Sequence, residues 1–195
     1  MSAACRVGRP RSTGSGPTLP ATNVGRQPVS LSRGVGASGY PRDYARPYHT
    51  DGMSTTVEGS YVESVERVQP NQANNYGNAH GGEVVKLMDE LAAIAAMRVA
   101  GETCVTAHIG SVDFQSPIAV GDVVELSAYV YETGESSLQV RVDADARDPR
   151  TADSRRTTAA CFTMVAIDDD GDPVSVPSVT ADTERGRELV AKAPC

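Results

Sequence analysis

The sequence predicts an α+β fold in which a curved antiparallel sheet of five to six strands wraps one long central helix. Residues 81–100 are apolar on nearly every side, which is typical of a helix covered by the rest of its domain. After this helix, four segments alternate apolar and polar residues with a period of two, which indicates antiparallel strands with one solvated face. One sheet packed on one helix is the simplest architecture that buries both the apolar helix and the apolar faces of the strands.

The first 52 residues differ in composition from the rest of the 195-residue chain. They hold seven arginines, no lysine and two acidic residues, a charge of +5, whereas residues 53–195 hold 11 basic and 23 acidic residues, a charge of −12. Eight glycines, six prolines and six serines leave residues 1–52 little to bury. We expect a disordered tail or, because the composition changes at Met53, a spurious N-terminal extension; an organelle transit peptide is the alternative.

The expected folded domain spans residues 58–178, and residues 179–195 are expected to form a polar tail with two helical turns over 184–192. Glycine at position 101 marks the end of the long helix, because glycine often follows the last helical residue. The other expected elements are strands over 60–68, 103–115, 122–132, 137–147 and 156–167. In the strand over 103–115, the residues that share one apolar face are Val105, Ala107 and Ile109.

The composition excludes several classes of site. The four cysteines are too far apart for a structural zinc site, and we expect Cys104 and Cys161 to be small core residues in a reducing cytoplasm. The acidic turn over 168–172 is expected to be a solvated hairpin end rather than a calcium loop, because Val179 stands where such a loop needs Glu. No segment approaches the length of a membrane span.

The negative charge of residues 53–195 also bears on which partners and which cellular environment the protein has. A charge of −12 argues against nucleic-acid binding. Only two lysines occur in the chain, and a lysine-poor acidic body suits a halophilic cytoplasm; an ordinary acidic protein is the alternative.

A polar turn over 74–82 that leads into the long helix is the strongest candidate site. Gly81 and Gly82 open the helix, where backbone N–H groups lack intrahelical partners and the helix dipole favours negative charge. Asp89 lies two turns inside the helix among apolar residues, where a carboxylate lowers stability unless it is solvated, paired or used. Oxyanion donors and a carboxylate base together suggest hydrolysis of an acyl group.

The sequence resembles the hotdog-fold acyl-CoA thioesterases, in particular the cytosolic acyl-CoA hydrolase branch, over residues 58–178. The order and spacing of several fragments carry the resemblance: Pro70-x3-Asn74-x2-Gly77-Asn78-x-His80-Gly81-Gly82, Lys86-Leu87-Met88-Asp89-Glu90, Val112-x-Phe114-x2-Pro117, Val120-Gly121-Asp122, Gly134-x-Ser136-Ser137, Val142-x-Ala144-Asp145 and Arg155-Arg156 with Phe162. The resemblance implies a hotdog fold, two protomers paired sheet edge to sheet edge, and a homodimer or a trimer of dimers.

The resemblance also implies roles for individual residues. Asp89 would be the general base or the nucleophile, and Asn74 would hold the water or the thioester oxygen. The N–H groups of Gly81 and Gly82 would stabilise the oxyanion, and His80 would either bind the thioester oxygen or cap the helix. The implied substrate-binding residues are Gly134, Ser136, Ser137, Arg155 and Arg156. We expect Asn75 and Asn78 to form the turn, Glu90 to be structural or exposed, and Met88, Phe114 and Tyr131 to be possible lining residues.

Helix geometry indicates that each site draws on two protomers. Eight residues separate Gly81 from Asp89, which is about 12 Å of helix rise, so one carbonyl cannot contact both. The expected activity is hydrolysis of acyl-CoA to a free acid and coenzyme A, with no metal or other cofactor. Two alternatives stay open, a hotdog hydratase or dehydratase that uses His80 with Asp89, and a non-catalytic acyl-CoA-binding module.

Overall fold

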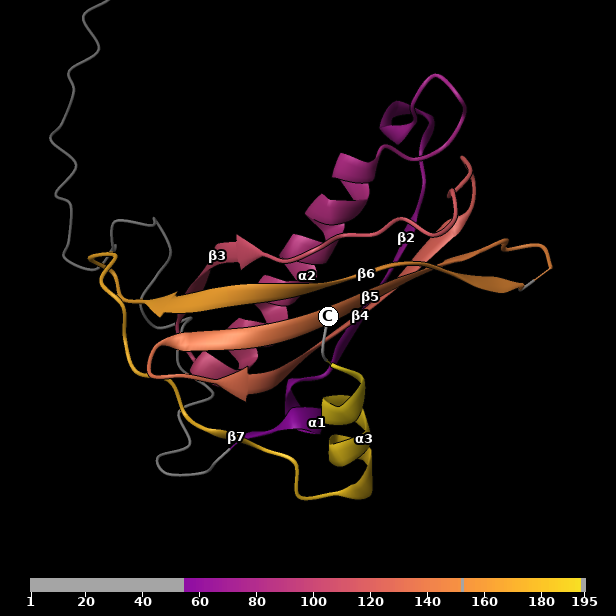
Figure 1. Cartoon of the computed structure of the whole chain (residues 1–195). Helices are drawn as coiled ribbons and strands as arrows, with labels where there is room; N and C mark the ends of the chain where they lie inside the picture. The colour runs from indigo at the N-terminus through magenta and orange to yellow at the C-terminus, as the bar shows by residue number, and fades with distance from the viewer. Residues whose placement is uncertain (1–54, 152, 194–195) are drawn as a thin grey trace, which may run out of the picture. The chain divides into compact units, whose positions relative to one another are not determined.

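The computed structural model describes residues 55–151 and 153–193, and within them a curled five-stranded antiparallel sheet holds a long helix on its concave side (Figure 1). The strand order is β2-β4-β5-β6-β3, so β2 and β3 are the two edges of the sheet. The predicted α+β architecture is confirmed. The strands and the helix are β2 (Val62–Arg67), α2 (Gly81–Ala100), β3 (Thr103–Ile109), β4 (Val123–Thr133), β5 (Ser137–Arg147) and β6 (Ser154–Ile167).

Helix α2 begins and ends where the sequence predicts. Gly101 adopts a left-handed conformation with φ of 69°, and its N–H bonds to the carbonyl of Met97, which closes the last turn. One face of α2 packs into the sheet through Val84, Met88, Leu91, Ala92, Ala95, Ala96 and Val99. Among the described residues, no helix is long and apolar enough to cross a membrane.

The alternation predicted for the central strands is confirmed on the concave face, where Leu138, Val140, Val142 and Ala144 of β5 are fully buried. The strand predicted over 103–115 is shorter, because β3 ends at Ile109 and residues 110–122 form a loop. This loop keeps only isolated bonds to β6, such as those from Gln115 N–H and the Ser116 hydroxyl. On β3, Cys104 faces the core, whereas Val105 and Ile109 are 42% and 36% exposed.

The convex face of the sheet is not fully solvated, which corrects the sequence prediction. Helices α1 (Val57–Ser60) and α3 (Glu184–Lys192) cover part of it, beside the parallel pair β1 (Thr55–Thr56) and β7 (Val179–Thr180). Val57, Tyr129 and Leu189 form a second small core there. Burial raises the pKa of Tyr129 to about 12, and its hydroxyl donates to the Leu189 carbonyl. The predicted helical turns over 184–192 therefore pack on the sheet.

The two cysteines that the structure describes differ in environment. Cys104 is a buried core residue, as predicted, and burial raises the pKa of its thiol to about 11. Cys161 is not in this core: it lies on the convex face, 3.3 Å from the carbonyl of Ala193. Within residues 55–151 and 153–193, no cluster of three His, Cys, Asp or Glu side chains could hold a metal ion.

Candidate functional site

The turn before α2 is organised by the side chain of Asn74. Its Oδ1 accepts hydrogen bonds from the N–H groups of Tyr76 and Asn78 at 2.9 and 3.2 Å, and Gly77 completes the turn with φ of 76°. Asn75 and Asn78 lie in this turn, as expected, but Asn74 itself makes the bonds that hold it. Because only Oδ1 has partners among the described residues, the amide Nδ2 of Asn74 has hydrogens to donate to a substrate.

The start of α2 offers backbone donors. His80 is the N-cap residue, but its side chain makes no capping hydrogen bond, which argues against its predicted capping role. The N–H groups of Glu83 and Val84 bond to the His80 carbonyl, whereas those of Gly81 and Gly82 have no partner in the part of the chain that the structure describes. The positive end of the helix dipole adds to their attraction for an anion.

Phe114 covers one side of this helix start. A Cβ atom on Gly81 would lie 3.1 Å from the ring of Phe114, whereas one on Gly82 would meet nothing within 4 Å. Phe114 is 49% exposed, so its ring stands beside the unpartnered N–H of Gly81 at the surface. A ligand can therefore approach the helix start from the side of Gly82. Of the other expected lining residues, Met88 is fully buried core and Tyr131 packs in the convex-face cluster.

Asp89 lies on the side of α2 that faces β3. It is half-buried, and its Oδ1 accepts a hydrogen bond from the Thr106 hydroxyl on β3 at 2.5 Å. This bond fixes the carboxylate at the sheet edge rather than in sealed hydrocarbon. The sequence analysis missed Thr106, because a threonine 17 residues after Asp89 on an edge strand belongs to no local motif.

The predicted substrate-binding residues lie at opposite ends of one protomer. Gly134, Ser136 and Ser137 form the β4–β5 hairpin, where the Ser136 carbonyl accepts the N–H of Ala166, near the C-terminal end of α2. A Cβ on Gly134 would lie 2.6 Å from the Ser137 hydroxyl oxygen, so a larger residue at this position requires the Ser137 side chain to move. The structure does not bring this hairpin to the start of α2 within one chain.

The two arginines lie at the other end of the sheet, near the start of α2. The Arg155 guanidinium pairs with Asp122 at 2.6 Å and donates to the Pro117 carbonyl. The Arg156 guanidinium pairs with Asp143 at 2.6 Å. Both side chains are partly exposed, at 40% and 54%, so each is accessible although it is already paired within the chain.

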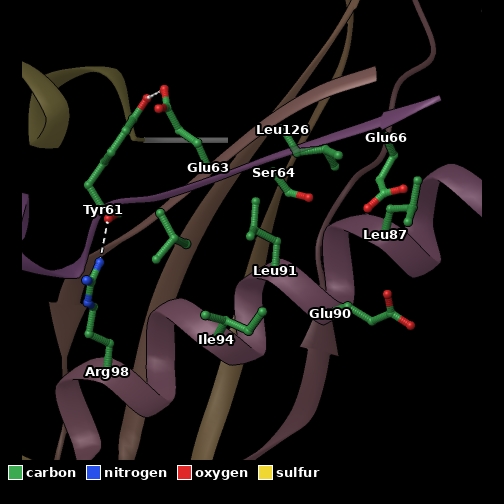
Figure 2. Close-up of a pocket in the computed structure, with 11 residues that line it drawn as sticks. Tyr61, Glu63, Ser64, Glu66, Leu87, Glu90, Leu91, Ile94, Arg98 and Leu126 are labelled. Carbon is green, nitrogen blue, oxygen red and sulfur yellow. Dashed lines mark hydrogen bonds between the residues drawn. The ribbon is translucent and has the colours of Figure 1, made fainter. Parts of the chain in front are cut away.

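A hollow lies elsewhere, between α2 and the edge strand β2 (Figure 2). Its volume is about 620 Å³, and Leu126 of β4 forms part of its floor. None of the predicted catalytic residues lines it, because Asp89 lies on the opposite side of α2. Glu90, which stands at its rim, is exposed as predicted and lies 3.7 Å from Lys86.

Residues 76–152 match the sequence model of the thioesterase superfamily. An acyl-CoA thioester hydrolase of Bacillus subtilis, described as uncharacterized, is 37% identical over 125 residues, which cover 64% of this chain and 73% of that protein. The cytosolic acyl coenzyme A thioester hydrolase of Rattus norvegicus is 33% identical over 150 residues. That match covers 71% of this chain and 39% of the rat protein, so this chain corresponds to less than half of it.

Solved structures show the same fold. A hexameric acyl-CoA thioesterase in its apo form has a TM-score of 0.68 at 39% identity, covering 73% of this chain and 91% of that one. An acyl-CoA hydrolase from Staphylococcus aureus, in complex with butyryl coenzyme A, coenzyme A and coenzyme A disulfide, has a TM-score of 0.66 at 33% identity, covering 72% and 85%. Structures also exist of its variants with one threonine, one aspartate or one asparagine replaced by alanine.

Proposed function

This chain belongs to the thioesterase superfamily as an acyl-CoA thioester hydrolase, and we propose that it cleaves its substrate with Asp89 and the N-terminus of α2. One observation carries this assignment of residues. The only two N–H groups at the start of α2 that lack a partner among the described residues, those of Gly81 and Gly82, follow directly after the turn that exposes the Asn74 amide. Hydrolysis of a thioester needs such donors where the oxyanion forms.

The proposed reaction proceeds through a tetrahedral intermediate. Asp89 takes a proton from water while the water oxygen attacks the thioester carbon, and the Gly81 and Gly82 N–H groups stabilise the resulting oxyanion. The carbon–sulfur bond then breaks, and the coenzyme A sulfur leaves with a proton. In the second route that the geometry allows, the Asp89 carboxylate attacks the thioester and water opens the mixed anhydride. Both routes need only water, so we propose no cofactor, and His80 and the Asn74 amide would orient the thioester oxygen.

We propose that each site forms between two protomers paired through β3. The helix start and Asp89 of one chain are too far apart to act on the same carbonyl. An antiparallel pairing of β3 with a second β3 brings opposite ends of two protomers together, so the hairpin of Gly134, Ser136 and Ser137 meets the arginine end of the partner. The exposed apolar residues Val105 and Ile109 support β3 as a covered edge in the assembly.

The spacing of the proposed residues has a parallel in the S. aureus enzyme. In that protein the three substituted positions, in the order asparagine, aspartate, threonine, lie 15 and 17 residues apart. Asn74, Asp89 and Thr106 lie in the same order at the same spacing. This agreement supports a site made of these three residues, with Thr106 as the residue that positions Asp89.

We further propose a cytoplasmic enzyme of fatty-acid metabolism, with acyl-CoA as substrate and no nucleic-acid partner. The cytosolic rat relative and the coenzyme A complexes of the S. aureus enzyme support this assignment. The acidic body of the chain supports a halophilic setting, which a comparison of activity in low and high KCl tests.

The decisive experiment measures thiol release from a series of acyl-CoA substrates. The wild-type protein releases thiol, and Asp89→Ala lowers kcat by about 10³ or more, while the binding of coenzyme A stays near the wild-type value. Glu90→Ala, one position along the helix, is the matched control and keeps its activity. Hydration of an enoyl-CoA without thiol release would indicate the hydratase alternative, and binding without turnover would indicate an acyl-CoA-binding module.

A further inference from the structure

Helix α3 is held on the convex face by contacts from α1 and β4. The Glu58 carboxylate of α1 accepts the N–H of Gly186 at 3.0 Å, beside the Thr183 hydroxyl that caps the same turn. Further along, Leu189 is buried, and its carbonyl accepts a hydrogen bond from the hydroxyl of Tyr129 on β4. The two short helices α1 and α3 lie beside each other on this side of the sheet (Figure 1).

The other end of α3 meets the sheet at Ala193, which is fully buried. Its carbonyl accepts a hydrogen bond from the Arg141 guanidinium at 3.4 Å and lies 3.3 Å from the sulfur of Cys161. Arg141 and Cys161 stand opposite each other on the neighbouring strands β5 and β6, so their side chains reach the same part of the convex face. Ala193 is therefore held directly over Cys161.

The two cysteines that the structure describes differ in bonding as well as in surroundings. Cys104 is a free thiol, whereas Cys161 is disulfide-bonded. Cys195 follows Ala193 by two residues. Two residues of extended chain span at most about 7 Å, and a disulfide joins residues whose Cα atoms are about 4.4–6.8 Å apart. The short chain after Ala193 therefore allows a bond between Cys195 and Cys161.

We propose that Cys161 and Cys195 are a reversible thiol–disulfide pair that locks α3 onto the convex face, with a low-molecular-weight disulfide as the oxidant. The thiolate of one cysteine attacks a sulfur of the reagent, whose sulfur–sulfur bond breaks and releases one small thiol. The thiolate of the other cysteine then attacks the protein sulfur of this mixed disulfide and releases the second small thiol. Each leaving sulfur takes up a proton that a cysteine lost, and an excess of small thiol reverses both steps.

The third described or bonded partner that could compete, Cys104, is unsuited to this exchange. Only a thiolate attacks a disulfide. Cys104 is 7% exposed, and burial raises the pKa of its thiol to about 11, so it stays protonated near neutral pH. Cys161 is half-buried on the opposite face of the sheet from Cys104. Cys104→Ala is therefore a matched control for the exchange.

The lock would set how often the small convex-face core opens to water. Without the disulfide, the Glu58 cap, the Tyr129 hydroxyl and the packing of Leu189 hold α3 in place. When α3 leaves the sheet, Val57 and Tyr129 lose the side chain that covers them. A disulfide disfavours such open states because it limits the freedom of the chain in them. The inference does not depend on the proposed function, since α2 lies on the concave side of the sheet.

Peptide mapping of protein treated with glutathione disulfide identifies the bond. Mass spectrometry of the unreduced digest should show the peptide that contains Cys161 joined to the peptide that contains Cys195, and dithiothreitol should separate them. Cys195→Ser should abolish this link, and Cys104→Ala should keep it. A bond from Cys161 to Cys5, or a glutathione adduct or a thiol at Cys161 in the treated protein, would overturn the inference.

Hydrogen exchange measures whether the bond locks α3. The amides of residues 184–192 should exchange about 30-fold more slowly, or more, in the oxidised wild type than in the reduced one, as the usual effect of a disulfide predicts. Cys195→Ser should exchange at the reduced rate under both conditions, and Cys104→Ala should retain the difference. Equal rates in the oxidised and reduced wild type would overturn the inference. Neither measurement uses acyl-CoA, so failure here is distinct from failure of the proposed function.

Discussion

In the proposed mechanism, the carboxamide of Asn74 has two tasks that separate atoms perform. Its Oδ1 holds the turn through the N–H groups of Tyr76 and Asn78, and its Nδ2 would donate to the substrate. The replacement Asn74→Asp keeps the acceptor and removes the donor. We expect kcat to fall by about 10²–10³, the usual loss for one oxyanion donor, with little change in the melting temperature.

Asn74→Ala provides the comparison, because it removes the acceptor as well. It should lose the same activity and, in addition, about 1 kcal/mol of stability for the broken turn. Thermal unfolding and thiol release on the two variants separate structure from catalysis. A fully active Asn74→Asp variant would leave Asn74 as a turn residue alone.

We expect Thr106 to act on the reaction through the Asp89 carboxylate, to which its hydroxyl donates a hydrogen bond. Thr106→Val keeps the shape of the side chain and removes the hydroxyl that donates to Asp89. Hydrogen bonds to charged groups contribute about 1.5–3 kcal/mol, so we expect kcat to fall about 10- to 100-fold while KM changes little. Thr106→Ser keeps the donor and should retain most of the activity. Equal activity of the valine and serine variants would show that this hydrogen bond has no role in turnover.

The sequence identifies those proposed site residues that belong to a local motif, and it misses those that only the folding of the chain brings to the site. Asn74, Gly81 and Asp89 lie within one turn and one helix, so the local patterns of that turn and that helix make them visible in the sequence. Thr106 reaches Asp89 only because β3 folds back beside α2, which no local pattern reports. Likewise, the pairing of Arg155 with Asp122 joins residues far apart in sequence, so the arginine pair could be noticed but its partners could not.

The start of α2 depends on two glycines with different surroundings. A Cβ on Gly81 would press against the Phe114 ring, whereas one on Gly82 would point into open space. We expect Gly81→Ala to lower stability by about 1 kcal/mol, the low end of the cost of overpacking, because the half-exposed Phe114 ring has to move by a few tenths of an ångström. Gly82→Ala, its matched control, should leave stability unchanged or raise it by up to about 1 kcal/mol, because alanine favours the helix.

Differential scanning calorimetry on both glycine variants checks this contrast. For a domain of this size, 1 kcal/mol corresponds to about 2–4 °C in melting temperature. The double variant Gly81→Ala/Phe114→Leu should recover part of the loss, since the ring no longer opposes the new methyl group. Equal melting temperatures for Gly81→Ala and Gly82→Ala would contradict the close contact.

Local sequence patterns predict the helices and strands well, but they do not predict which faces of the sheet other elements will cover. The period-two alternation in β5 correctly identifies Leu138 and Val142 as core. The same pattern places Arg141 in water, yet it is 7% exposed, because α3 packs over the convex face and the Arg141 guanidinium pairs with Asp143. Thr183 caps this helix and Leu189 anchors it, so its position depends on contacts with Tyr129 across 60 residues of chain.

In the proposed dimer, each active site takes residues from both protomers. Mixing two inactive variants tests this prediction directly. Asp89→Ala lacks the carboxylate, and Asn74→Asp lacks the donor beside the partner's carboxylate. In a mixed dimer, one site combines the intact Asn74 of the first chain with the intact Asp89 of the second, while the other site carries both defects. Random exchange of subunits makes half of the dimers mixed, so about a quarter of the wild-type activity should return.

Subunit exchange is followed by native mass spectrometry, and thiol release is measured before and after mixing. Mixing two preparations of Asp89→Ala with different mass tags is the control, since every site then lacks its carboxylate and no activity should return. If the donors and Asp89 acted within one chain, the mixed dimer would contain no intact site and activity would stay at the level of the separate variants. Recovery to about a quarter therefore requires that the Asn74 of one chain and the Asp89 of another act on the same thioester.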